Sequence, residues 1–403
     1  MKRASGVLMP VFSLPSKYGI GCFSKEAYKF VDWLKDAGQT YWQILPLGPT
    51  GYGDSPYQSF STYAGNPYFI DLKTLVKEGL LTKKECKEVR CKEQKKIDYE
   101  KIYQNRFKIL KKAYRRFQKN DKYEKFLEEN AFWLEDYCMY MAIKDAHEGK
   151  SWSEWEELLK KREKTALEKV KEELEDEIGF YQFQQYEFDR QWKKLHTYAK
   201  EQGIQIIGDI PIYVAFDSAD AWAAPELFQF DEENNPIRVA GCPPDAFAKT
   251  GQLWGNPLYN WEYHQKTGYA WWIQRIRYCF QHYDVVRIDH FRGFDEYYAI
   301  PYGESTAENG TWMPGPGMKL FQAIEKELGR PEIIAEDLGF LTESVLQMLK
   351  ESGFPGMKVL QFAFDPSGES VYLPHRYSEN CVVYTGTHDN DTILGWMKQA
   401  PKN

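Results

Sequence analysis

The sequence predicts an α/β fold in which short buried strands alternate with helices. Seven short apolar runs, each bounded by Gly, Pro or Asp, are separated by longer mixed segments. Runs this short and apolar are typical of parallel strands that are buried on both faces. Acidic residues follow several of these runs, at the strand ends where the active site of a (β/α)8 barrel lies. No glycine-rich phosphate-binding motif follows an early strand, so we predict a (β/α)8 TIM-type barrel rather than a doubly wound nucleotide-binding sheet.

The expected strands and helices follow in chain order. The strands are expected at residues 7–10, 41–45, 204–210, 285–288, 333–335, 358–362 and 382–385. The helices between them are expected at residues 25–37, 270–282, 319–328 and 342–352. Repeated alternation of strand and helix at this length is typical of such a barrel.

Charge density divides the chain into two parts. Between residues 73 and 200, 57 of 128 positions are charged and none is proline, whereas all 20 prolines lie elsewhere. Apolar residues recur there at helical spacing between the charged ones, which predicts a set of amphipathic helices. We therefore predict a helical insertion subdomain at 73–200, within a catalytic barrel formed by residues 1–72 and 201–403.

Composition excludes several classes of partner and cofactor. The net charge of −7 provides no positive field for nucleic acid or an anionic membrane surface, so neither partner is expected. The apolar stretch near the N-terminus is broken by Pro10 and Pro15, unlike a signal peptide. Seven scattered cysteines favour reduced thiols in the cytoplasm. No cysteine or histidine set has the spacing of a metal site, and we expect neither metal nor cofactor.

Ionisable groups at the predicted strand ends indicate the chemistry. Asp209, Asp289, Glu336 and Asp389 each follow an apolar run. A single aspartate at such a position often only caps the next helix, but several carboxylates in one pocket repel each other and acquire different pKa values. Glycosidic bond cleavage requires such a division between an ionised and a protonated carboxyl.

Two of these acids have neighbours that suit them to the two roles. Arg287 and Asp289 are two positions apart on one strand, so their side chains share a face and the guanidinium would keep Asp289 ionised as a nucleophile. Glu336 follows an apolar run that would raise its pKa toward that of a general acid.

Two long polar segments, residues 48–68 and 242–261, are rich in aromatic and amide side chains. We predict that 242–261 is a loop that exposes Phe247, Trp254 and Tyr259. Exposed aromatic rings can stack on pyranose rings while amides and carboxylates bind the hydroxyls. The alternative is that these aromatic rings only anchor long loops to the barrel.

Six motifs together resemble the amylomaltases, the 4-α-glucanotransferases also called disproportionating enzymes. These are GPTGYGDSPYQSFSTYAGNPY, GDIPIYVAFDSADAW, PPDAFAKTGQLWGNPLY, VVRIDHFRGF, AEDLG and GTHDND. The resemblance implies retaining transfer of an α-1,4-glucan segment through a covalent glucosyl-enzyme intermediate. It implies as partners α-1,4-glucans, maltooligosaccharides and glucose.

The resemblance also implies roles for individual residues. Asp289 would be the nucleophile, Glu336 the general acid/base, and Asp389 a third acid that binds sugar hydroxyls, while Asp209 would have a supporting position. Substrate-binding roles are implied for Tyr57, Asp245, Gln252, Trp254, Asn256, Arg287, His290 and His388.

The resemblance leaves one structural question and two functional alternatives. Amylomaltases continue beyond the THDND motif, whereas this chain ends soon after it with seven expected strands, so we expect a barrel truncated before its eighth strand. An α-glucan hydrolase with the same acids is one alternative, and a glucan-binding fragment that is inactive through truncation is the other. The segment 242–261 favours transfer, because it could cover the site and exclude water.

Overall fold

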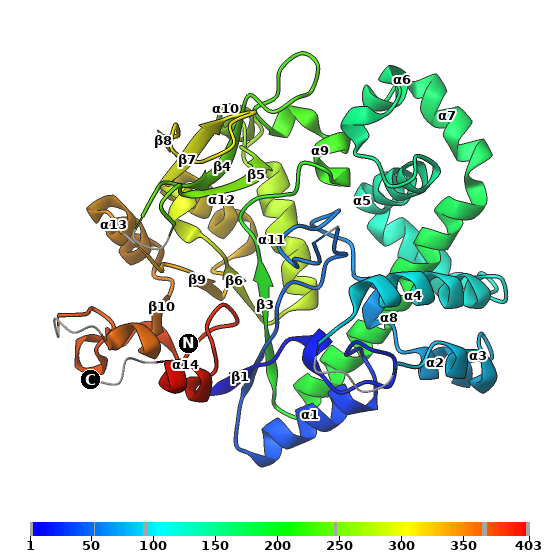
Figure 1. Cartoon of the computed structure of the whole chain (residues 1–403), viewed down its shortest axis with the longest axis horizontal. Helices are drawn as coiled ribbons and strands as arrows, with labels where there is room; N and C mark the ends of the chain where they lie inside the picture. Colours follow the sequence, from blue (N-terminus) through cyan, green and yellow to red (C-terminus); the bar gives the residue numbers. More distant parts are fainter. Residues whose placement is uncertain are drawn as a thin grey trace.

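Parallel strands form the centre of the computed structural model, which describes residues 3–51, 53–91, 96–245, 248–339, 341–364 and 369–399 (Figure 1). Five strands form one parallel sheet in the order β1-β2-β3-β6-β9. Their bounds are Gly6–Leu8, Tyr41–Gln43, Gln205–Ile210, Val285–Ile288 and Ile333–Ala335. A second parallel pair consists of β10, Gly356–Val359, and β11, Cys381–Tyr384. Within the described ranges these seven strands confirm the predicted parallel architecture.

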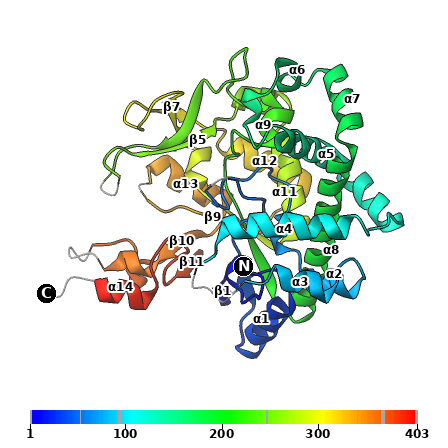
Figure 2. The same ribbon diagram turned by 45° about the vertical axis from the view of Figure 1, so that its right-hand side comes forward.

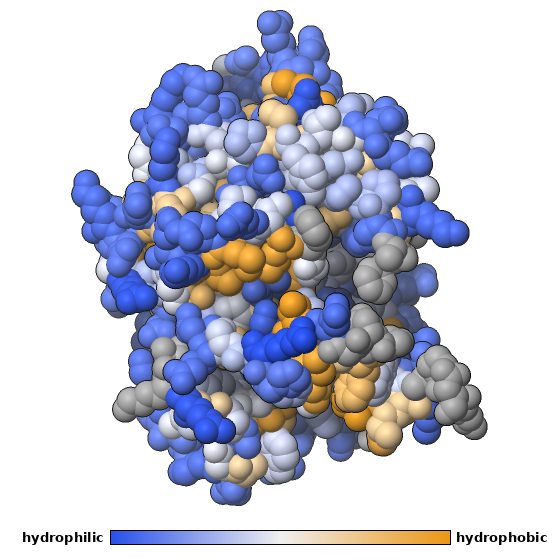
Figure 3. Space-filling view, turned by 90° about the vertical axis from the view of Figure 1, so that its left-hand side faces the viewer, coloured by the Kyte–Doolittle hydropathy of each residue, from blue (hydrophilic) through white to orange (hydrophobic). Residues whose placement is uncertain are grey.

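The central strands are buried on both faces, as their apolar sequences predict. Every residue of β6 and β9 is buried. The last strand, β11, is more exposed to solvent than these, and its Val383 is 50% exposed. Figure 3 shows the face that carries the C-terminal elements, where apolar surface gathers in the middle and lower parts. In the described part of the chain β1 pairs only with β2, and β11 only with β10.

The prediction of a strand at 358–362 is wrong in its position. The strand is Gly356–Val359, and Leu360–Ala363 forms a 3₁₀ helix. In this turn the buried Gln361 donates from Nε2 to the carbonyl oxygen of Asp391 at 2.9 Å. A short apolar run does not by itself distinguish strand from helix, and the partner of Gln361 is 30 residues away.

The four predicted helices of the barrel are present with nearly the predicted bounds. They are α1 (Lys25–Asp36), α11 (Ala270–His282), α12 (Met318–Leu328) and α13 (Glu343–Ser352). The hydroxyls of Ser24 and Thr342 cap α1 and α13 at their N-termini, where such side chains replace missing backbone acceptors. Three short helices complete this part: α9 (Ala219–Ala223), α10 (Trp261–Lys266) and α14 (Ile393–Gln399).

The charge-rich segment is helical, as its periodicity predicts. Its helices are α2 (Leu72–Lys77), α3 (Lys83–Glu88), α4 (Tyr99–Tyr114), α5 (Asp121–Ala146), α6 (Glu157–Lys160), α7 (Lys164–Glu173) and α8 (Glu175–Glu201). They lie on the side of the molecule opposite α14 in both ribbon views (Figures 1 and 2). Helix α8 joins this segment to β3, and its Phe188 and Trp192 pack on Phe23 of the barrel. The insertion therefore shares a hydrophobic core with the barrel.

A four-stranded antiparallel sheet replaces much of the loop predicted at 242–261. Its order is β5-β4-β7-β8, with bounds Gln252–Pro257, Arg238–Cys242, Glu296–Pro301 and Thr311–Pro314. Tyr259, predicted to be exposed, is 1% exposed and donates to the carbonyl oxygen of Ile212 at 2.8 Å. Phe247 lies outside the described residues. The sequence concealed this sheet because β4 pairs with β7, nearly sixty residues further along the chain.

None of the helices in the described ranges combines the length and the apolarity that a membrane span requires.

Candidate active site

The sheet register brings three of the predicted acids to one end of neighbouring strands. Asp209 lies opposite Arg287 in the pairing of β3 with β6. The next strand ends are tied together because Asp289 N donates to the carbonyl oxygen of Ile210 at 2.9 Å and Glu336 N donates to that of Ile288 at 3.0 Å. The carboxyl ends of parallel strands share an edge, so the three acids converge there.

Arg287 binds two of these acids at once. Its Nη1 contacts both carboxylate oxygens of Asp209 at 2.7 and 2.8 Å, and its Nη2 contacts Oδ1 of Asp289 at 2.9 Å. Arg287 is 3% exposed and Asp209 1%. The predicted common face of Arg287 and Asp289 is therefore confirmed, and the guanidinium leaves Oδ2 of Asp289 without a contact to it.

The buried pair predicts a large effect on stability. We expect Asp209→Asn to lower the free energy of unfolding by about 3 kcal/mol, because removal of one partner leaves a buried charge poorly compensated. Urea unfolding would measure the loss. Glu262→Gln is the control, since Glu262 pairs with Lys266 where both side chains are at least 70% exposed, and it should leave the free energy of unfolding almost unchanged. Equal losses in the two variants would contradict this prediction.

Glu336 is held in a position where its carboxyl group can remain protonated. Its Oε2 accepts a hydrogen bond from His290 N and its Oε1 accepts one from Leu338 N, both at 2.8 Å. The pKa of Glu336 is raised to about 7. Burial is the largest cause and the charge of Asp289 the next, while Arg287 and the two backbone donors oppose the change. Neighbouring carboxyls in such different settings can divide the roles of nucleophile and acid.

Tyr57 connects Asp209 with the THDND motif. Its hydroxyl donates to Oδ2 of Asp209 at 2.8 Å, and burial together with Asp209 raises the pKa of Tyr57, so the hydroxyl keeps its proton. His388 Nε2 lies 2.9 Å from the same hydroxyl oxygen. Because that hydroxyl has only one proton to give, His388 Nε2 is the donor in this second contact. The His388 ring also stacks on Tyr57, with centroids 5.5 Å apart.

Asp389 lies at the open end of this series of contacts. Its Oδ1 is 3.4 Å from His388 Nε2, and its side chain is 78% exposed. Continuous contacts therefore join Asp389 to Asp289 through His388, Tyr57 and the Asp209–Arg287 pair. No group of three or more side chains within the described ranges is arranged to hold a metal ion.

Strand β5 and the connection before it bring further predicted residues to the site. The Trp254 ring meets the His290 ring edge-on with centroids 4.8 Å apart, and Trp254 Nε1 donates to Oε1 of Gln252 at 3.1 Å. Burial lowers the pKa of His290 to about 4, so this imidazole is neutral at neutral pH. The carboxylate of Asp245 accepts from Ala248 N at 2.6 Å.

The amide of Asn256 has partners within the protein. Its Nδ2 donates to the carbonyl oxygen of Val214 at 2.7 Å, and its Oδ1 accepts from Gln58 Nε2 at 3.1 Å. Asn256 thus joins the 48–63 segment to β5, and its role as a substrate ligand stays a prediction. Gln58 was missed by sequence reasoning, because a glutamine in a polar loop carries no signal of its partner.

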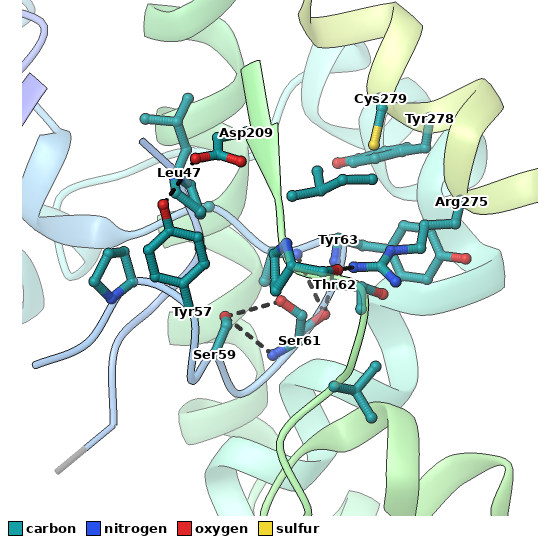
Figure 4. A pocket seen from close by; sticks show the side chains of 18 of the residues that line it. Leu47, Tyr57, Ser59, Ser61, Thr62, Tyr63, Asp209, Arg275, Tyr278 and Cys279 are labelled. Atoms are coloured by element: carbon teal, nitrogen blue, oxygen red, sulfur yellow. Dashed lines mark hydrogen bonds between the residues drawn. The ribbon is translucent and has the colours of Figure 1, made fainter. Parts of the chain in front are cut away.

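A cavity of about 70 Å³ lies beside this network. Figure 4 shows Tyr57 and Asp209 on one side of it and Tyr278 and Arg275 on the other. The lining is mostly apolar, but a cavity of this size has room for ordered water beside polar groups such as the Asp209 carboxylate. The buried Arg275 donates to the carbonyl oxygens of Ile212 at 3.0 Å and Pro211 at 2.5 Å. It thereby fixes the backbone directly after the strand that carries Asp209.

Comparisons with known proteins agree with this arrangement. A family model described as 4-alpha-glucanotransferase, glycoside hydrolase family 77, matches residues 9–403. The chain is 52% identical over 394 residues to the 4-alpha-glucanotransferase of Clostridium butyricum, covering 97% of this chain and 81% of that protein. The enzyme of that name from Streptococcus pneumoniae is 52% identical over 402 residues, which cover 98% of this chain and 80% of that protein.

Among solved structures, the amylomaltase from Streptococcus agalactiae in complex with acarbose superimposes with a TM-score of 0.97. It is 44% identical, and the match covers 100% of this chain and 82% of that chain. This likeness confirms the predicted (β/α)8 TIM-type fold. The chain therefore belongs to glycoside hydrolase family 77 and is a 4-α-glucanotransferase.

Proposed function

We propose that transfer proceeds by a retaining double displacement in which Asp289 is the nucleophile and Glu336 the general acid and base. The observation that supports it most is the different setting of the two carboxyls. Asp289 has one oxygen bound to Arg287, whereas burial raises the pKa of Glu336 to about 7. In the first step Oδ2 of Asp289 attacks the anomeric carbon, the bond from that carbon to the glycosidic oxygen breaks, and Glu336 gives its proton to the leaving oxygen.

The second step reverses the first with a new sugar. Glu336, now ionised, takes the proton from the 4-hydroxyl of the acceptor glucan or glucose. The acceptor oxygen attacks the anomeric carbon, and the ester bond to Asp289 breaks. Two inversions restore the original configuration, which is what an α-1,4 product requires.

The remaining site residues are proposed to hold the sugars. Asp389, with its exposed carboxylate, would bind ring hydroxyls at the site of cleavage together with His388. The Trp254 ring would stack on an acceptor sugar, with Gln252 and Asp245 nearby. We propose α-1,4-glucans and maltooligosaccharides as donors, and these or glucose as acceptors.

The assignment of chain segments and compartment is also proposed. Residues 1–72 and 201–403 would form the catalytic unit, because every proposed site residue lies in them. Residues 73–200 would support it. A cytoplasmic location is supported by the seven cysteines, all of which are free thiols and would be suited to a reducing compartment.

Incubation with maltotriose tests the proposed function. We expect a ladder of longer and shorter maltooligosaccharides plus glucose, with reducing ends almost constant, because each transfer breaks one glycosidic bond and forms another. Chromatography of the products and a reducing-sugar assay would measure both quantities. A steady increase of reducing ends without longer products would contradict transfer and indicate hydrolysis.

A further inference from the structure

The helical insertion contacts the 48–63 loop, which carries Tyr57 and Phe60, through a buried lysine of α5. Lys144 is 6% exposed. Its Nζ donates to Oδ2 of Asp217 at 2.5 Å and to the carbonyl oxygen of Lys150 at 3.0 Å, and lies 5.3 Å from the centroid of the Phe60 ring. A buried ammonium group is costly unless it is paired. These three partners therefore fix where Lys144 can lie.

Asp217 collects further contacts from the insertion. Its Oδ1 accepts from the hydroxyl of Tyr140 at 2.5 Å and from Trp152 N at 3.4 Å. Tyr140 is also on α5, and its ring packs near that of Phe60 with centroids 6.5 Å apart. Asp217 itself belongs to the segment that follows β3. A single carboxylate thus joins the insertion to the barrel.

Asp220, three residues after Asp217, binds the 48–63 loop. Asp220 accepts from Thr62 N at 2.8 Å and from the Thr62 hydroxyl at 2.7 Å. Ala219 N donates to the carbonyl oxygen of Phe60 at 2.8 Å. The DSAD stretch therefore contacts the insertion through Asp217 and the loop through Asp220. This stretch lies in the motif GDIPIYVAFDSADAW, and the catalytic mechanism uses neither of these two acids.

Phe60 is close in the chain to Tyr57. The backbone beside both residues is tied to an earlier part of the chain, because Phe60 N donates to the carbonyl oxygen of Pro49 at 3.4 Å and Ser59 pairs with Thr50. A displacement of the Phe60 ring would move Tyr57 relative to Asp209 and His388. Misplacement by about 1 Å can cost about 100-fold in rate when a reacting group depends on the displaced contact.

We propose that Lys144 is a positioning residue for the transfer reaction. It holds Phe60 and Asp217 together, and through them it places the Tyr57 hydroxyl between Asp209 and His388. The helical insertion is then part of the machinery that sets the catalytic acids, and more than an external support of the barrel. This inference rests on the double displacement proposed above for Asp289 and on the contacts of the Tyr57 hydroxyl with Asp209 and His388.

The test compares variants in the disproportionation of maltotriose, at a temperature well below the lowest melting temperature. Lys144→Met keeps the aliphatic stem and removes the charge and the donors. We expect it to lower kcat about 10-fold, and Lys144→Arg to recover most of that loss. In a Tyr57→Phe background, Lys144→Met should add almost nothing, because the two changes act through one hydroxyl and a double-mutant cycle reports that coupling.

Arg190→Met is the matched control. Arg190, on α8, pairs with Glu78 and Glu187 at 2.7 and 2.6 Å and has no hydrogen bond or ion pair to residues 48–63 in the described structure. It should lower the melting temperature and leave kcat unchanged. If Lys144→Met does not fold, Phe60→Leu replaces it, with the same expected loss and the same lack of additivity.

Two results would overturn the inference. One is an unchanged kcat in folded Lys144→Met, or in folded Phe60→Leu if that variant replaces it. The other is a full additional loss in the Tyr57→Phe background, which would show that the cluster acts independently of that hydroxyl. Failure of the proposed function is distinguishable, because it would appear in the unchanged protein as hydrolysis of maltotriose, or in Asp289→Asn as undiminished transfer.

Discussion

Asp289→Asn is expected to lower kcat for the disproportionation of maltotriose by about 10⁴-fold, since loss of a nucleophile removes the covalent route. The amide cannot attack the anomeric carbon, yet it nearly preserves the shape of the carboxylate. Its oxygen can still accept from Arg287, whose Nη2 lies 2.9 Å from Oδ1 of Asp289. The fold should therefore survive, and the loss should appear in kcat far more than in the melting temperature.

The control for this variant is another aspartate close by in the chain. Asp295 accepts from the Ser344 hydroxyl at 2.7 Å and lies six residues beyond Asp289, so Asp295→Asn should keep kcat within about twofold. A direct check is mass spectrometry after reaction with a 5-fluoroglucosyl fluoride, which should label the peptide that contains Asp289. Transfer at a normal rate by Asp289→Asn, or a label on another peptide, would refute its assignment as nucleophile.

Glu336→Gln is expected to lower kcat/KM for glucan donors by about 10³-fold, within the range typical of a lost general acid. The loss depends on the leaving group. Fluoride leaves without a proton, so formation of the intermediate from α-maltosyl fluoride should be affected far less. Rapid-mixing measurements of fluoride release would separate this step from the later transfer. Equal losses with both donors would contradict the role of Glu336 as the acid.

The pH dependence gives an independent measurement of the same group. Burial raises the pKa of Glu336 to about 7, so the carboxyl carries its proton below that pH and loses it above. We expect kcat/KM for glucan donors to fall about 10-fold per pH unit well above pH 7, the dependence on one ionising acid. The fall should be absent in Glu336→Gln and kept in Glu332→Gln, the control. A pH profile of kcat/KM that does not fall above pH 7 would contradict the assignment of Glu336 as the general acid.

The sequence predicted where three of the acids lie because two rules of parallel sheets are local. Side chains alternate along a strand, so Arg287 and Asp289 had to share a face. The carboxyl ends of parallel strands meet at one edge, so Asp209, Asp289 and Glu336 had to converge. Both expectations required only the strand positions, and β6 and β9 lie at the predicted residues.

Other features depended on contacts that no local pattern encodes. The antiparallel sheet that carries Trp254 forms because β4 pairs with β7 far along the chain. The strand expected at 358–362 ends at Val359, where Gln361 bonds to a distant carbonyl. Tyr384 donates to Gln43 at 2.7 Å across 341 residues, which the polar character of either residue alone does not predict.

The sequence by itself determined which strands are followed by acidic residues and that the charge-rich segment is helical. It also determined the residue types available to the site. These follow from periodicity and composition, which short segments encode. Only the tertiary structure decided that Lys144, one of many charged residues in an amphipathic helix, is buried on Asp217 beside Phe60. It also decided that His388 donates to Tyr57. Burial and pairing depend on which distant segments meet, and no single segment carries that information.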